Sequence, residues 1–211
     1  MTAALVHFKW RRDPGNPVLP LDPASAWESA RCMNPFVVRS GGEYWLYYSG
    51  GAADGRQRLC LATTPAVTPL ITGDQTVEFP HNRGVAGGGT IVEEQRADGA
   101  VQYRMYYTLA VGRKSPDVRV DQEKHCAVCH SVDGIRWTDH RLIMSPRKEV
   151  PNEDIAVAAP FVWREAGIYR MLYCGIGTRW GYYSISEAVS ADGYIWERGK
   201  GDANLIPRFY A

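Results

Sequence analysis

The chain has 211 residues, with 24 Lys and Arg against 23 Asp and Glu, and a formal net charge of +1 at neutral pH. This balance excludes a protein that recruits nucleic acid through bulk positive charge. Hydrophobic residues make up 45% and charged residues 22%, so we expect one ordered domain, 1–211, with a sizeable core. The 11% of aromatic residues, together with 21 Gly and 13 Pro, are typical of a β-rich protein with many tight turns.

The first ten residues lack a charged segment followed by a long apolar one, so a secretory signal is not expected. No run approaches 18 apolar residues, so no membrane span is expected either. We therefore expect a cytoplasmic protein. Its five cysteines are an odd number, and we expect them to be reduced and mostly buried in strands. Residues 22–31 are expected to form one short turn of helix before the first strand.

An internal repeat organises the chain. Residues 35–50 (PFVVRSGGEYWLYYSG) and 160–175 (PFVWREAGIYRMLYCG) align without a gap and share eight identical positions. A looser copy runs from Gly89 to Thr108. Each copy predicts a short apolar strand and an aromatic strand joined by a tight turn. The predicted turn residues are Gly41-Gly42, Asp98-Gly99 and Ala166-Gly167.

A second repeated element follows each of the last two hairpins, with the pattern S-x-D-G-x-x-W at 131–137 and 190–196. Asp-Gly predicts a turn, and the Trp is expected to pack on the neighbouring sheet. One unit is therefore four strands, and such units at a period of about 60 residues are β-propeller blades. The sequence predicts an all-β propeller with three four-stranded blades, at about 32–75, 85–140 and 153–198.

The opening of this pattern resembles the five-bladed β-propeller glycosidases, the relatives of arabinanases, xylosidases, invertases and levansucrases. The resemblance rests on Asn16-Pro17-Val18-Leu19, Trp27 and Asn34-Pro35-Phe36-Val37, and on the blade ends with S-x-D-G-x-x-W. It covers residues 10–207 and implies five blades, of which three are present in the chain. A propeller of three blades has open edges, so either the chain is a fragment of a longer relative or a homo-oligomer closes these edges, and we favour a dimer.

The resemblance also implies where catalytic carboxylates would stand. In these glycosidases one carboxylate directly precedes the Pro of the first blade, where this chain has Asn34, and the general acid matches Ala158. The carboxylate of the second blade has no match in 85–89. Glycoside hydrolysis needs two carboxyl groups across the scissile bond. The standard catalytic positions are therefore substituted.

Three other carboxylates are candidates for relocated catalytic acids. Glu153 and Asp154 precede the first strand of the third blade, where a propeller chain enters the central funnel. Asp22 precedes the first blade. The alternative for Glu153-Asp154 is a solvated acidic turn after Pro151-Asn152.

Four residues are candidates for binding substrate. Asn34 would hydrogen-bond a sugar hydroxyl, or it forms an Asn-Pro turn into a strand. Trp27 would stack on a sugar, or it closes the core, which we favour. His81 and Arg83 lie before the glycine run 87–89, which allows close approach of a ligand, or they belong to a polar loop between blades.

The segment 126–130 matches C-x-x-C-H, a haem attachment pattern. It falls where the repeat requires a strand, in which Cys126 and Cys129 point to opposite faces and cannot bind one haem or metal ion. We expect no cofactor and no metal. The charged stretch 113–121 is a lid or an oligomer contact, or a solvated loop, which we favour.

Three functions remain open from the sequence. The first is a glycoside-hydrolase-like protein that acts on a carbohydrate or a sugar-bearing small molecule with non-standard catalytic residues. The second is a non-catalytic sugar-binding or scaffold protein that has lost hydrolase activity. The third is a propeller fragment whose function depends on blades that are not in this sequence. None of them involves nucleic acid or a membrane as a partner.

Overall fold

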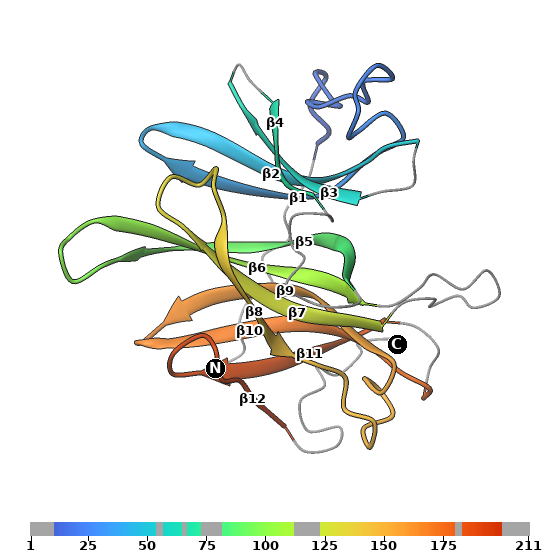
Figure 1. Cartoon of the computed structure of the whole chain (residues 1–211), viewed down its shortest axis with the longest axis vertical. Coiled ribbons are helices and arrows are strands. Elements are labelled where there is room, and N and C mark those ends of the chain that lie inside the picture. The colour runs from blue at the N-terminus through green and yellow to red at the C-terminus, as the bar shows by residue number, and fades with distance from the viewer. Residues whose placement is uncertain are drawn as a thin grey trace.

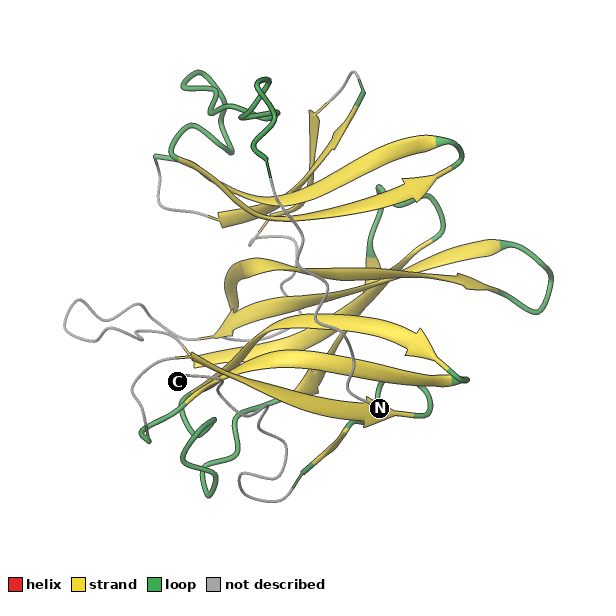
Figure 2. Cartoon of the chain, turned by 180° about the vertical axis from the view of Figure 1, so that it is seen from behind, coloured by secondary structure: helices red, strands yellow, loops and turns green. Residues whose placement is uncertain are grey.

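The computed structural model describes residues 11–53, 57–64, 67–72, 82–111, 123–179 and 183–199. They form three antiparallel sheets of four strands, stacked along the long axis of the molecule (Figure 1). The strands of each sheet are neighbours in chain order. The view from behind in Figure 2 shows strands and loops without a helix in the described part of the chain. The prediction of an all-β propeller with three four-stranded blades is confirmed.

The three sheets are called blades 1, 2 and 3 below. Blade 1 contains β1 (Arg31–Ser40), β2 (Glu43–Gly51), β3 (Gln57–Thr63) and β4 (Val67–Thr72). Blade 2 contains β5 (Asn82–Gln95), β6 (Val101–Val111), β7 (Glu123–Ser131) and β8 (Thr138–Met144). Blade 3 contains β9 (Ala156–Glu165), β10 (Ile168–Ile176), β11 (Tyr183–Ser190) and β12 (Glu197–Arg198).

The first hairpins of blades 1 and 3 turn through two residues with positive φ. Gly41 and Gly42 have φ of 57° and 89°, and Ala166 and Gly167 have φ of 50° and 86°. Positive φ at both central residues is the geometry of a type I′ turn, whose twist matches that of the paired strands. The turns therefore fall at the predicted residues and fix the register of both hairpins.

Each blade carries a bulge in its first strand, opposite a buried tyrosine of its second strand. The pairs are Asn34-Pro35 with Tyr48, Gly88-Gly89 with Tyr107, and Ala159-Pro160 with Tyr173. Asn34 and Ala159 have left-handed φ values of 54° and 51°. A bulge redirects a strand locally and is common beside functional sites. The three bulges therefore occupy one equivalent position around the fold.

The S-x-D-G-x-x-W segment after β7 is a turn that closes on itself. Ser131 Oγ accepts a hydrogen bond from the Gly134 amide at 2.8 Å. The amides of Ile135 and Arg136 donate to Asp133 Oδ1, and these bonds, led by that from Arg136, lower the pKa of Asp133. Trp137 Nε1 donates to the Gly134 carbonyl at 3.1 Å. The second copy, Ser190 to Trp196, makes the same set of bonds.

These turns connect each blade to the preceding one. Tyr47 of blade 1 donates to the Gly134 carbonyl at 2.9 Å, and Arg104 of blade 2 donates to the Asp192 carbonyl at 2.6 Å. A Cβ added at Gly134 would lie 2.1 Å from Trp45, and one at Gly193 would lie 2.3 Å from Arg104. The glycines are needed because the facing side chains occupy the space of a Cβ.

Two clusters of buried side chains form the core, one on each side of blade 2. The cluster between blades 1 and 2 is built on Tyr47, Leu59, Ile91, Tyr103, Met105, Tyr107, Cys129 and Trp137. The cluster between blades 2 and 3 is built on Tyr106, Cys126, Val128, Val162, Tyr169, Met171 and Tyr173. The aromatic residues of the repeat thus serve mainly as packing between blades, and Trp137 packs on the neighbouring sheet as predicted.

The expected turn of helix over 22–31 is wrong. Short polar side chains bond to their own backbone there instead: Asp22 Oδ1 accepts from the Ala24 amide, and Ser25 Oγ accepts from the amides of Trp27 and Glu28. Such local bonds stabilise turns at the expense of a helix. None of the described residues form a helix long and apolar enough to cross a membrane.

Candidate functional site

A cavity of about 540 Å³ lies where the first strands of the three blades approach one another. Its wall includes the bulged residues and their neighbours on β1, β5 and β9: Asn34, Phe36, Gly87, Thr90, Ala158 and Phe161. A cavity of this volume accommodates a small organic ligand. The bulges create it, because they turn each first strand at the level where the blades meet.

The wall combines apolar surfaces with a few polar groups. Phe36 and Phe161 supply aromatic surface, and Asn34 supplies a neutral amide. At one side, Lys124 Nζ donates to Tyr183 Oη at 3.3 Å. Among the lining residues that the structure describes, Lys124 carries the one formal charge, and there is no Asp or Glu.

Two threonines of the wall join blade 2 to blade 3. Thr90 Oγ1 accepts a hydrogen bond from the Val162 amide at 2.7 Å, and Thr108 Oγ1 accepts one from the Ala159 amide at 2.8 Å. The Ala159 amide is thereby satisfied although its residue lies in a bulge. These bonds hold the wall of the cavity in a fixed shape.

The positions that the resemblance assigns to catalytic carboxylates converge on this cavity. Asn34 and Ala158 both line it. The glycine run contributes Gly87 and Gly89, and a Cβ added at Gly87 would lie 3.3 Å from Asn34 Nδ2. Three segments far apart in the chain therefore form one site, but the residues found there cannot exchange protons as a pair of carboxyl groups does.

Glu153 lies outside this wall and is fully buried. Its carboxylate accepts hydrogen bonds from Arg147 Nε, from Arg198 Nη1 at 3.0 Å and from Tyr173 Oη at 2.6 Å. Two guanidinium groups thus balance one buried negative charge. The surroundings are those of an ion pair that joins β12 and the loop before β9 to β10.

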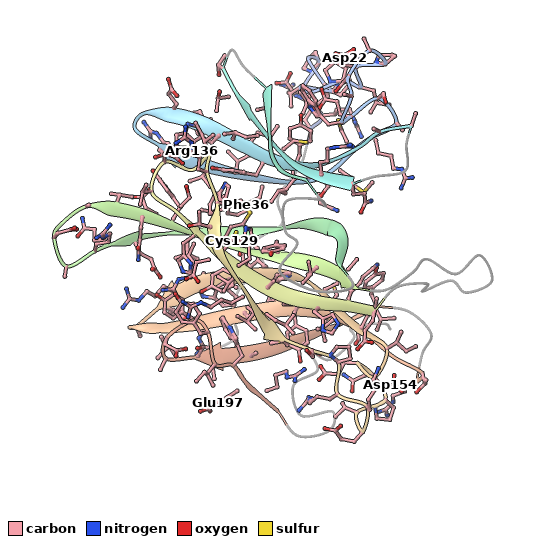
Figure 3. The ribbon with its side chains drawn as sticks, in the orientation of Figure 1. Asp22, Phe36, Cys129, Arg136, Asp154 and Glu197 are labelled. Carbon is pink, nitrogen blue, oxygen red and sulfur yellow. The ribbon has the colours of Figure 1, made fainter. Side chains whose placement is uncertain are left out.

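The Asp154 side chain has partners different from those of Glu153, and Asp22 lies far from both. Asp154 is bonded through Oδ1 to the Thr178 amide at 2.8 Å and through Oδ2 to the Thr178 hydroxyl at 2.7 Å. In Figure 3, Asp22 and Asp154 lie at opposite ends of the molecule, with Phe36 of the cavity between them. The three predicted carboxylates do not form a common site.

Glu28 is a buried residue that the sequence reasoning missed. It accepts a hydrogen bond from Tyr48 Oη, twenty residues later, just as Glu153 accepts one from Tyr173, twenty residues later. Both glutamates stand six residues before the bulge of their blade. The gapless repeat therefore extends upstream to these glutamates, and this equivalence was the available signal for a structural role.

Of the other predicted binding residues, the structure describes Trp27 and Arg83. Trp27 is half-buried, and its carbonyl oxygen lies 2.6 Å from the position of a Cβ added at Gly50, so its segment packs on β2. Arg83 lies in β5, whereas His81 and the stretch 113–121 lie outside the described residues. The binding roles of these residues stay predictions.

The C-x-x-C-H segment lies in β7 with its cysteines on opposite faces, as the strand period predicts. Cys129 packs in the cluster between blades 1 and 2, and Cys126 in that between blades 2 and 3. Burial raises the pKa of both thiols, and it raises the pKa of Cys60 to about 12. The two cysteines of this motif cannot bind one ion together.

Buried thiols of raised pKa are slow nucleophiles, so native protein should react with a thiol reagent at no more than two cysteines, the half-buried Cys32 and Cys174. Ellman's reagent with and without denaturant measures this directly. All five cysteines should react after unfolding. Rapid labelling of Cys126 or Cys129 in native protein would contradict the packing described here.

Comparison with solved structures relates this fold to glycoside hydrolases. A thermostable family-43 glycoside hydrolase superposes with a TM-score of 0.57 at 18% identity, covering 89% of this chain and 61% of that one. A putative glycoside hydrolase from Bacteroides ovatus superposes with a TM-score of 0.60 at 16% identity, covering 97% of this chain and 64% of that one. These likenesses show that the chain has the fold of the propeller-type glycosidases.

A relative found by sequence comparison is longer than this chain. An uncharacterized protein, Rv1502 of Mycobacterium tuberculosis, is 24% identical over 200 residues, which cover 88% of this chain and 60% of that protein. No family model matches the sequence. The chain thus spans about three fifths of the length of this relative and of the two glycoside hydrolases above.

Proposed function

We propose that the chain binds a carbohydrate in the cavity between the three blades and does not hydrolyse it through a pair of carboxyl groups. One observation carries this proposal. The two positions where the resemblance implies carboxylates, Asn34 in blade 1 and Ala158 in blade 3, line one cavity, and no described lining residue is acidic. The glycoside hydrolases of similar fold support a carbohydrate as the ligand class.

The wall suits a neutral sugar. The Asn34 side chain has two donors and one acceptor oxygen, which match a pair of sugar hydroxyl groups without a charge. Phe36 and Phe161 supply aromatic faces for the C–H surface of a sugar ring. Lys124 and Tyr183 add donors at the edge. The nearly neutral chain, with its net charge of +1, fits such a ligand better than a polyanion.

The competing proposal is a hydrolase with relocated acids. Glu153 fits this role poorly, because two arginines and Tyr173 already bond to its buried carboxylate. Asp154 is half-buried and bonded to Thr178, and Asp22 bonds to its own turn. A general acid requires a raised pKa and a position beside the scissile bond. The described contacts of these carboxylates favour structural roles.

Calorimetric titration with a panel of neutral mono- and oligosaccharides tests the proposal. We expect saturable binding of at least one sugar, with no product detected by chromatography after long incubation. Asn34→Ala should weaken that binding about tenfold, because it removes a hydrogen-bonding amide. The backbone tolerates this change, since Ala159 adopts the same left-handed conformation in blade 3.

Two controls accompany this experiment. Asn16→Ala, at an exposed asparagine remote from the wall, should leave the affinity unchanged. Asp154→Asn should also leave binding unchanged. Sugar turnover that Asp154→Asn or Glu153→Gln abolishes, in protein that remains folded and still binds sugar, would establish the relocated acids and refute the proposal.

A further inference from the structure

The face of blade 1 that points away from blade 2 exposes residues whose equivalents are buried elsewhere. Tyr44 is 62% exposed, whereas the tyrosines at the same position in blades 2 and 3, Tyr103 and Tyr169, are 7% and 5% exposed. Val37, which flanks Tyr44 on β1, is likewise exposed, while its equivalents Ile91 and Val162 are buried. We call this surface, with Val37 and Tyr44, the leading face. In blades 2 and 3 it is covered by the preceding blade.

On blade 3 the exposed residues lie on the other face of the sheet, the one that points away from blade 2. Ile185 is 52% exposed, whereas Leu59 and Cys126, which occupy the same register position in blades 1 and 2, are 2% and 0% exposed. Phe161 on β9 is also half exposed. We call this surface, with Phe161 and Ile185, the trailing face. In blades 1 and 2 it is covered by the next blade.

The contact between a trailing and a leading face occurs twice within the chain, and these two copies show which side chains pair in it. Between blades 1 and 2, the Tyr103 ring lies 5.7 Å from that of Trp45 and shares a hydrogen bond with Ser40. Between blades 2 and 3, the Arg104 guanidinium lies 5.1 Å from the Tyr169 ring, which is a cation–π contact.

The uncovered trailing face carries the matching cation. Arg170 occupies the register position of Trp45 and Arg104 in blade 3, and its side chain is partly exposed beside Glu165 and Glu187. Each chain therefore presents both halves of an interface that it already forms internally: Tyr44 on the leading face, and Arg170, paired with Glu165 and Glu187, on the trailing face.

We propose that a second copy of this chain docks here, with the leading face of each copy against the trailing face of the other. The contact continues the interface between the blades and uses the same residue positions. Two copies related by a two-fold axis bury both faces at once and leave no apolar sheet face open, which is the condition for a closed assembly. An exposed patch of this kind on a soluble protein otherwise favours uncontrolled association.

Light scattering during gel filtration over a range of concentrations tests the proposal. Wild-type protein is expected to run at twice the 23.6 kDa of one chain. A mass of 23.6 kDa at every concentration would overturn the proposal, and the two faces would then belong to contacts with a different polypeptide. Sugar binding by a monomer would still be measurable, so this outcome is distinct from failure of the proposed function.

Two charge variants make the test specific to the pairing of unlike faces. Tyr44→Lys breaks the leading face and Ile185→Lys the trailing face, and each should raise the dissociation constant of the dimer at least about 100-fold. Mixing the two variants should give a mixed dimer that is tighter than either variant alone, because the trailing face of the first and the leading face of the second form one of the two contacts intact. A pairing of like faces would leave one variant dimeric, which would overturn the proposal.

Val132→Lys is the matched control, since Val132 is also exposed but lies in the turn after β7, outside the sheet positions that define the two faces. It should leave the dimer intact. Because all three positions are exposed in one chain, the variants should fold, and circular dichroism verifies this. A variant that unfolds is replaced by Val37→Lys for the leading face or Ile185→Glu for the trailing face.

Discussion

Glu153→Ala is expected to lower the free energy of unfolding by about 3 to 5 kcal/mol, the cost of breaking a buried ion pair from one side. The change removes the acceptor shared by Arg147, Arg198 and Tyr173, and it leaves two guanidinium groups in a site where Glu153 is 0% exposed. Urea unfolding monitored by tryptophan fluorescence measures the loss.

Three comparison variants sharpen this result. Asp154→Asn, at the half-buried neighbour, keeps one of the two acceptor oxygens that bond to Thr178 and should cost less than about 1.5 kcal/mol. Glu153→Gln keeps the shape and one acceptor and should cost less than the alanine variant. Glu28→Gln perturbs the equivalent bond to Tyr48 in blade 1. If Glu153→Ala unfolded at the wild-type urea concentration, the structural role assigned to this carboxylate would be refuted.

Gly89→Ala is expected to destabilise the protein by at least about 3 kcal/mol, because the added methyl group overlaps the backbone of the adjacent strand. A Cβ at Gly89 would lie 1.5 Å from the Tyr106 carbonyl oxygen and 2.5 Å from its carbon. Neither atom can rotate away as a side chain would. Accommodation requires β5 to separate from β6 beside the cavity, so sugar binding should fall as well.

Gly99→Ala separates this steric effect from the conformational cost of losing a glycine. Gly99 has a φ of 81° in the β5–β6 turn, and a Cβ there meets no atom within 4 Å. Its replacement should cost about 1 to 2 kcal/mol, the strain of an L-residue at positive φ. Equal losses for the two variants, measured by thermal or urea unfolding, would contradict the close approach of β5 and β6.

The blades could be predicted from the repeat because its residues determine the local backbone conformation of the turns. Gly41-Gly42 and Ala166-Gly167 mark turns that require positive φ, and the two S-x-D-G-x-x-W segments close through bonds between residues three apart. Such features depend on neighbours in sequence. The opposite orientation of Cys126 and Cys129 was predictable for the same reason, since it follows from the period of a strand.

The candidate site was harder to predict because it depends on contacts between blades. Asn34 and Ala158 were located by resemblance, but nothing local indicated that the carboxylate of Glu153 turns away from the cavity to Arg147 and Arg198. An acidic residue near a funnel has the same sequence pattern whether it is an acid catalyst or an ion-pair partner. Only the extension of the repeat to Glu28 distinguishes the two.

The docking of each S-x-D-G-x-x-W turn on the preceding blade has a consequence for how the molecule comes apart. The hydrogen bonds from Tyr47 to Gly134 and from Arg104 to Asp192 couple neighbouring sheets in series, as in an array of repeats whose stability is a sum of unit and nearest-neighbour terms. Blade 2 shares a core cluster with a sheet on each side. We therefore expect blade 2 to be the most stable of the three sheets, and partial unfolding to begin with blade 1 or blade 3.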